Sequence, residues 1–199
     1  MNTTTIAAFV AGIALTAVAV PRVALTQSED QKKLVEEMMA KARRWTQPGD
    51  NHKVLERFLG RWNTEVKLAG SSQGEKGTTE CTWLIKERWL QMHGKGTMMG
   101  MPSETFYVLG YDNFKMSFVT TAVTNMDTAM LSSEGDMDPS GEVLITYGTL
   151  DEYLTGEHDK MVKYVWRFHG KDKIVCEVHD LPIGEKNTKV VEIAYTRAN

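Results

Sequence analysis

The chain has 199 residues, of which 42% are hydrophobic, so its length favours one domain with one substantial core. Its 26 acidic and 23 basic side chains give a formal net charge of -3. Because the basic residues are scattered along the chain, they create no positive field for gripping a phosphate backbone, and we expect no nucleic-acid partner.

Residues 1–19 have the features of a secretory signal peptide. The first 20 residues carry no charged side chain, and an apolar run from Ile6 to Val20 ends in the small-x-small pattern Ala17-Val18-Ala19. An uncleaved membrane anchor is the alternative, although this run is shorter than the roughly 20 residues that a membrane-spanning helix needs. We therefore expect export to the periplasm or the exterior, with membrane contact only through this segment.

Residues 20–47 are predicted to form a linker and an amphipathic helix. Ser28 and Gln31 fit a capping box, and a helix is predicted over 29–45, before Pro48-Gly49 ends it. The apolar residues that recur at helical spacing are Leu34, Val35, Met38, Met39, Ala42 and Trp45. Such a face is typical of docking, either on the same protein or on a partner.

The segment 48–199 is predicted to be a single β-barrel domain that opens with a short capping helix. Asp50 begins this helix, and Gly60 follows it as the residue able to take a left-handed conformation. From Trp62 onward the hydrophobic period changes from helical to two.

Ten strand-like runs separated by short polar or glycine-rich turns fill the rest of the chain. They cover residues 61–68, 77–85, 89–96, 103–111, 116–123, 129–136, 142–150, 160–168, 173–180 and 189–197. No helix-length segment interrupts them, so successive strands should pair antiparallel. The predicted fold is all-β, a ten-stranded antiparallel up-and-down barrel, because closure removes the exposed edges.

Alternation along single strands predicts which side chains face inward. On 160–168, Lys163 and Arg167 share one face, and the opposite face is apolar and aromatic. Cys81 and Cys176 fall on the inner faces of the second and ninth strands. Three strand spacings of about 4.8 Å separate them around the wall, which is too far for a disulfide, so two free buried thiols are expected.

A barrel of this size can hold a small hydrophobic molecule, and binding or carriage of such a ligand is the preferred function. The alternation predicts a set of inward-facing candidates for ligand binding: Trp83, Gln91, His93, Phe106, Phe118, Tyr147, Tyr164 and Trp166. The same side chains could instead fill the barrel as its core. No cofactor is expected.

The stretch "FLGRWNTEVKL" carries Gly60-x-Trp62 at the start of the first strand and resembles the calycin signature of lipocalins and fatty-acid-binding proteins. In that superfamily a basic residue near the end of the last strand lies across the tryptophan that closes one end of the barrel. The resemblance therefore implies that Arg197, in "VVEIAYTR", covers Trp62 as a closure plug.

A second resemblance covers residues 48–198. The segments "PGDNHKVLERFLGRW", "TMMGMPSETFYVLGYDN", "NMDTAMLSSEGDMD" and "VHDLPIGEKNTKVVEIAYTR" are similar, in order and spacing, to the bacterial family called domain of unknown function 1579. The resemblance implies a calycin-like barrel and supplies no catalytic residue.

An enzyme and an interaction module are the alternative functions. A polar pocket around His93, Gln91 and Glu104 could provide an acid–base pair, although the chain has no G-x-S-x-G or H-E-x-x-H motif. The interaction module would recruit a partner through the helix at 29–45.

Haem and soft-metal binding are further alternatives. In "HGKGTMMGMPSE", His93 is followed by Met98, Met99 and Met101, and imidazole and thioether groups suit Cu(I). For haem, His93 is the inward candidate ligand, because His179 shares its face with Glu177 and should point outward.

Overall fold

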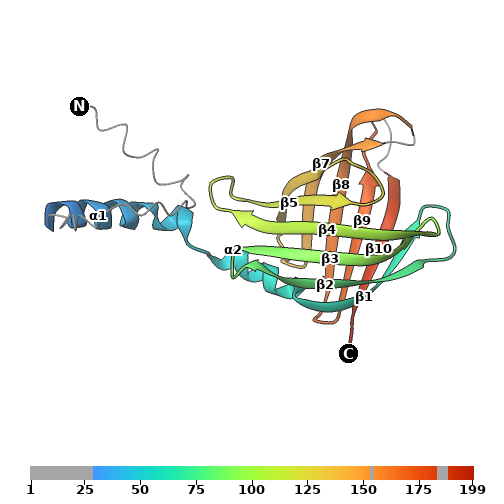
Figure 1. Ribbon diagram of the computed structural model, residues 1–199, viewed down its shortest axis with the longest axis horizontal. Helices are drawn as coiled ribbons and strands as arrows, with labels where there is room; N and C mark the ends of the chain where they lie inside the picture. Colours follow the sequence, from blue (N-terminus) through green and yellow to red (C-terminus); the bar gives the residue numbers. More distant parts are fainter. Residues whose placement is uncertain (1–28, 153–154, 183–187) are drawn as a thin grey trace, which may run out of the picture. The chain divides into compact units, whose positions relative to one another are not determined.

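Ten antiparallel strands form a closed barrel in a computed structural model, which describes residues 29–152, 155–182 and 188–199 (Figure 1). The strands are β1 (Gly60–Leu68), β2 (Glu75–Ile85), β3 (Trp89–Met98), β4 (Met101–Asp112), β5 (Ser117–Thr124), β6 (Leu131–Met137), β7 (Val143–Glu152), β8 (Glu157–His169), β9 (Lys173–Asp180) and β10 (Thr188–Arg197). Each strand pairs with its neighbours in sequence, and β1 pairs with β10. The predicted ten-stranded up-and-down barrel is confirmed.

The helices also lie where the sequence predicts them. They are α1 (Glu29–Thr46), α2 (Asp50–Lys53) and the 3₁₀ turn η3 (Val54–Phe58). The first turn of α1 is acidic and its last turn contains Arg43 and Arg44, which suits the helix dipole. Within the described residues, no helix has the length and apolar character needed to cross a membrane. The signal peptide predicted for 1–19 and the Ser28 cap lie outside the described residues, and export stays a prediction.

The short helical segment plugs one end of the barrel. Leu55 and Phe58 are fully buried, and the Phe58 ring meets those of Trp166 and Phe168 edge-on, at centroid distances of 5.5 and 5.1 Å. The indole N–H of Trp62 donates to the Phe58 carbonyl at 2.8 Å. This end of the core is therefore packed with aromatic rings and one satisfied polar group.

Arg197 completes the plug. Its guanidinium lies 4.2 Å from the centre of the Trp62 ring, donates to the carbonyls of Leu59 and Lys171, and is 3.2 Å from an Asp172 carboxylate oxygen. Gly60 has φ +116° and no side chain, and a Cβ there would lie only 2.6 Å from Arg197 Nη1. The glycine thus makes room for the cation that covers the indole.

Side chains alternate between the interior and the outer surface as the β8 pattern predicts. Val162, Tyr164, Trp166 and Phe168 are at most 6% exposed and form the central part of the core. Cys81 and Cys176 are free and buried, which confirms the prediction of two unpaired thiols. Burial raises the pKa of the Cys81 thiol to about 12 and also raises that of Cys176, so both stay protonated near neutral pH.

The methionine-rich stretch between β3 and β4 is a tight hairpin at the end opposite the plug. Met98 pairs with Met101, and the two residues between them, Met99 and Gly100, have φ values of +53° and +75°. Positive φ at both positions is the type I′ pattern that fits the strand twist. One Glu75 carboxylate accepts the N–H of Met99 at 2.6 Å and of Gly100 at 3.2 Å, which anchors the turn to β2.

Replacing Trp62 with alanine should lower the free energy of unfolding by about 3–5 kcal/mol, because the buried indole leaves a cavity. Urea denaturation measures the change. Arg61→Ala is the matched control, since Arg61 neighbours Trp62 but faces solvent and pairs with Glu80 across the surface. We expect it to cost no more than about 1 kcal/mol. Equal losses for the two variants would contradict the buried plug.

Acid should release the β3–β4 turn from Glu75. Hydrogen bonds from the Gly100 N–H, the Thr97 hydroxyl and the Met99 N–H lower the pKa of this carboxyl below its ordinary value of 4.5. The folded state therefore favours the ionised form, and the anchoring is complete above pH 4.5 and disappears as the pH falls through the lowered pKa. Amide NMR shifts of Met99 and Gly100 should titrate with a midpoint below 4.5. Glu75→Gln should abolish this titration, and a midpoint at or above 4.5 would refute the anchoring.

Candidate functional site

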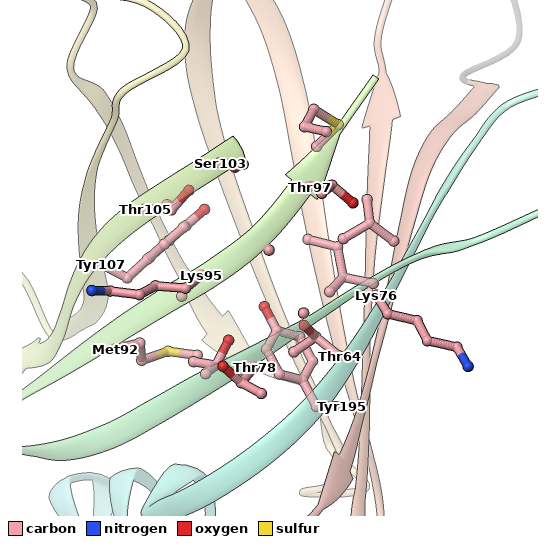
Figure 2. Close-up of a pocket in the computed structure, with 17 residues that line it drawn as sticks. Thr64, Lys76, Thr78, Met92, Lys95, Thr97, Ser103, Thr105, Tyr107 and Tyr195 are labelled. Atoms are coloured by element: carbon pink, nitrogen blue, oxygen red, sulfur yellow. The ribbon is translucent and has the colours of Figure 1, made fainter. Parts of the chain in front are cut away.

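A cavity of about 120 Å³ lies inside the barrel against the wall formed by β1 to β4 and β10 (Figure 2). Its apolar lining residues are Val66, Met92, Met98 and Ile193, and its hydroxyl-bearing ones are Thr64, Thr78, Thr79, Thr97, Ser103, Thr105, Tyr107 and Tyr195. The cavity runs from Met92, which is buried, to Met98 and Ser103 beside the β3–β4 hairpin, which are partly exposed. Solvent therefore reaches it at the end opposite the plug.

Glycines on the inward faces of β2 and β3 create this space. Gly94 and Gly96 alternate along β3, and Gly77 lies opposite Gly96 on β2. A Cβ on Gly96 would lie 2.9 Å from Gly77 Cα, and one on Gly77 would lie 2.6 Å from the Lys95 carbonyl oxygen, so the two strands approach too closely there for side chains. This wall of the barrel is bare backbone, while the opposite end is filled with rings.

Two tyrosines face the cavity from β4 and β10 (Figure 2). Tyr107 and Tyr195 both pack against Trp166, with ring centroids 6.1 and 5.8 Å away. Burial raises the pKa of both phenols well above 10, so their hydroxyls remain protonated. Neither hydroxyl forms a hydrogen bond with any other described residue, which leaves two donors available at the cavity.

Two charged side chains touch the described lining, and neither belongs to an inward-facing row. Lys76 and Lys95 touch the cavity edge but belong to the outward-facing rows, and the Lys95 ammonium lies 3.2 Å from Glu104. At the same end of the barrel, Lys160 and Asp180 form an ion pair at 2.8 Å, which raises the pKa of Lys160 and neutralises both charges.

Four of the eight ligand-binding candidates lie in the interior. Phe118, Tyr164 and Trp166 are nearly inaccessible, and Trp83 is half-buried against the same core. None of them lines the cavity; they fill the barrel around and below it. These four side chains therefore pack as part of the core, which is the alternative to ligand binding that the sequence left open.

The other four, Gln91, His93, Phe106 and Tyr147, lie on the outer surface, and the expectation that they face inward is wrong. On β3 the inner row is Leu90 and Met92, which places Gln91 and His93 outside. His93 stacks on Phe106 at 4.0 Å between ring centroids, and Tyr147 is 49% exposed. Because apolar residues occupy both faces of these strands, alternation could not decide between the two orientations.

The polar pocket proposed for an enzyme is not assembled in the interior. His93 Nε2 and a Glu104 carboxylate oxygen are 2.6 Å apart on the outer surface, and hydrogen bonds from His93 and Lys95 lower the pKa of Glu104. Gln91 instead donates to the Thr82 hydroxyl at 3.1 Å. The pair thus has the geometry of a surface ion pair beside an aromatic ring.

The histidine and methionine side chains predicted as alternative ligands of haem or a soft metal do not come together at one site. His93 is outside, and His179 lies on the outer surface 3.7 Å from Glu177, as its alternation predicts. Met98 lines the cavity, whereas Met99 and Met101 are 45% and 49% exposed on the hairpin. Over the part of the chain that the structure describes, no three His, Cys, Asp or Glu side chains come together as a metal site.

Sequence reasoning missed the residues that shape the cavity: Gly77, Gly94, Gly96, Met92, Tyr107 and Tyr195. One signal was available, because "HGKG" alternates glycine with large side chains on a predicted strand. Glycine inside a strand often marks a close approach of backbone or ligand. Met92 and Tyr107 could be identified as cavity residues only once the inward faces of β3 and β4 were known.

Comparisons with known proteins give one family and several solved structures. A phycobiliprotein lyase CPES from Guillardia theta superposes with a TM-score of 0.49 at 12% identity, covering 78% of this chain and 96% of the lyase. A de novo designed fluorescence-activating β-barrel gives 0.41 at 9% identity, covering 73% of this chain and 97% of the design. No curated protein sequence matches the chain significantly. The family model described as "Protein of unknown function (DUF1579)" matches residues 47–197, and the chain belongs to this family.

Proposed function

We propose that this protein binds a small, largely apolar molecule in the cavity of its barrel. The observation that carries the proposal is a space bounded by bare backbone, by the apolar side chains of Met92, Met98 and Ile193 and by serine, threonine and tyrosine hydroxyls, in a barrel whose other end is plugged. Apolar walls with a few polar groups are typical of small-molecule sites.

The size of the cavity limits the ligand. At about 120 Å³ it is smaller than the roughly 300–1,000 Å³ of sites for drug-sized molecules. It is close to the roughly 150 Å³ of an engineered apolar cavity that binds benzene. The ligand, or the part of it that enters the barrel, is therefore about the size of one ring or a short chain. A longer molecule would extend past Met98 toward the hairpin.

Methionine methyl NMR tests this proposal with α-methylstyrene, a neutral probe with one ring. The methyl signals of Met92 and Met98 should shift on titration, because both residues line the cavity, and that of the surface residue Met161 should not. For a probe of nine heavy atoms a dissociation constant of about 0.1–5 mM is expected.

A matched pair of variants locates the binding. Gly94→Val places a branched side chain in the cavity, where the nearest atom to its Cβ is Thr79 Oγ1 at 3.3 Å, and should abolish the shifts. His93→Val changes the next residue, on the outer surface, and should leave them intact. Circular dichroism checks that both variants fold. Absence of shifts in the unmodified protein, or unchanged binding in a folded Gly94→Val variant, would refute the proposal.

A further inference from the structure

The two tyrosine hydroxyls at the cavity indicate which chemical groups a ligand would carry. Tyr107 and Tyr195 both lie in the wall of the cavity, and their hydroxyls are not among the buried polar atoms of the described residues that lack a partner, so they are open to the cavity. A ligand that displaces water from this space has to replace the hydrogen bonds that the water makes to such groups. The cavity therefore presents phenol donors from β4 and β10, the two edges of its wall, beside threonine and serine hydroxyls and the apolar side chains of the same lining.

Charge on the ligand is disfavoured. Transfer of an ion from water into an apolar interior is expensive unless an opposite charge meets it. Lys160 and Asp180, inward-facing charges at the open end of the described barrel, are already paired with each other at 2.8 Å, and the Glu75 carboxylate at the same end accepts the N–H groups of Met99 and Gly100. Because the phenols stay protonated, they offer hydrogen bonds without adding a charge.

The remaining wall suits a flat apolar group. Met92 and Met98 contribute thioethers, which make favourable contacts with aromatic rings and adapt to irregular shapes. The bare backbone of Gly94 and Gly96 lets such a group approach the sheet closely. A carbonyl oxygen is the simplest match to the tyrosines, because it accepts hydrogen bonds and brings no donor of its own.

We infer that the ligand class is an uncharged carbonyl compound, such as a ketone, ester or amide on one ring or a short chain, whose oxygen accepts hydrogen bonds from Tyr107 and Tyr195 while its apolar part lies against Met92 and Met98. This inference rests on the proposed function and adds the chemistry of recognition. The tyrosines are binding residues and no reaction is implied.

The test compares acetophenone with α-methylstyrene, which has nearly the same shape and carries a methylene group in place of the carbonyl oxygen. Affinities are measured by the same methyl NMR titration in the unmodified protein and in Tyr107→Phe and Tyr195→Phe. Each substitution should weaken acetophenone binding about 3- to 10-fold, the value of one hydrogen bond, and should not weaken α-methylstyrene binding. Tyr147→Phe, on the outer surface, is the control and should change neither affinity.

The outcomes separate the two proposals. If both Phe variants keep the affinity for acetophenone, or lose affinity for both probes equally, the carbonyl inference is overturned while interior binding stands. If neither probe shifts the Met92 and Met98 signals of the unmodified protein, the proposed function itself fails. Benzoate at the same concentration should produce no shift in these signals, and interior binding of this anion would also overturn the inference.

Discussion

Pairing of the first strand with the last is the constraint on which the rest of this structure depends. β1 and β10 pair over seven residue positions, and this register brings Arg197 opposite Trp62, Tyr195 opposite Thr64 and Ile193 opposite Val66. The first of these pairs belongs to the plug, and the other two belong to the cavity wall. Closure of the barrel thus assembles the sealed end and the candidate binding site from segments about 130 residues apart in the chain.

The two ends of the barrel show how packing divides the interior. At the plug, aromatic rings and a guanidinium fill the space, and the Trp62 indole and the Arg197 guanidinium both donate to backbone carbonyls. At the other end, glycines take the place of side chains, and Tyr107 and Tyr195 keep hydroxyls without partners among the described residues. A protein interior is normally packed close to crystal density, so a space walled by glycine backbone at one end is a departure that function can explain.

Comparison of β8 with β3 shows how far alternation can predict an interior. On β8 one face carries Lys163 and Arg167, so the other face could be assigned to the core, and it is buried. On β3 a tryptophan and a histidine share the face opposite Leu90 and Met92, and both faces are compatible with burial. His93 is accommodated outside because it stacks on Phe106 and bonds to Glu104. The outer surface of a barrel can thus carry its own aromatic contacts, which the sequence pattern does not distinguish from core.

The sequence by itself determined the number, order and approximate bounds of the strands, the short helix before them and the isolation of the two thiols. These follow from local periodicity, turn residues and the strand spacing, all of which act over short stretches of chain. Only the tertiary structure decided which faces of β3 and β4 turn inward, and therefore that Met92 and Tyr107, and not His93 and Phe106, meet the interior. It also placed Tyr195 beside Gly77 and Gly94 at one cavity. The physical reason is that orientation and cavity formation depend on how ten strands fit together when the barrel closes, and no single strand carries that information.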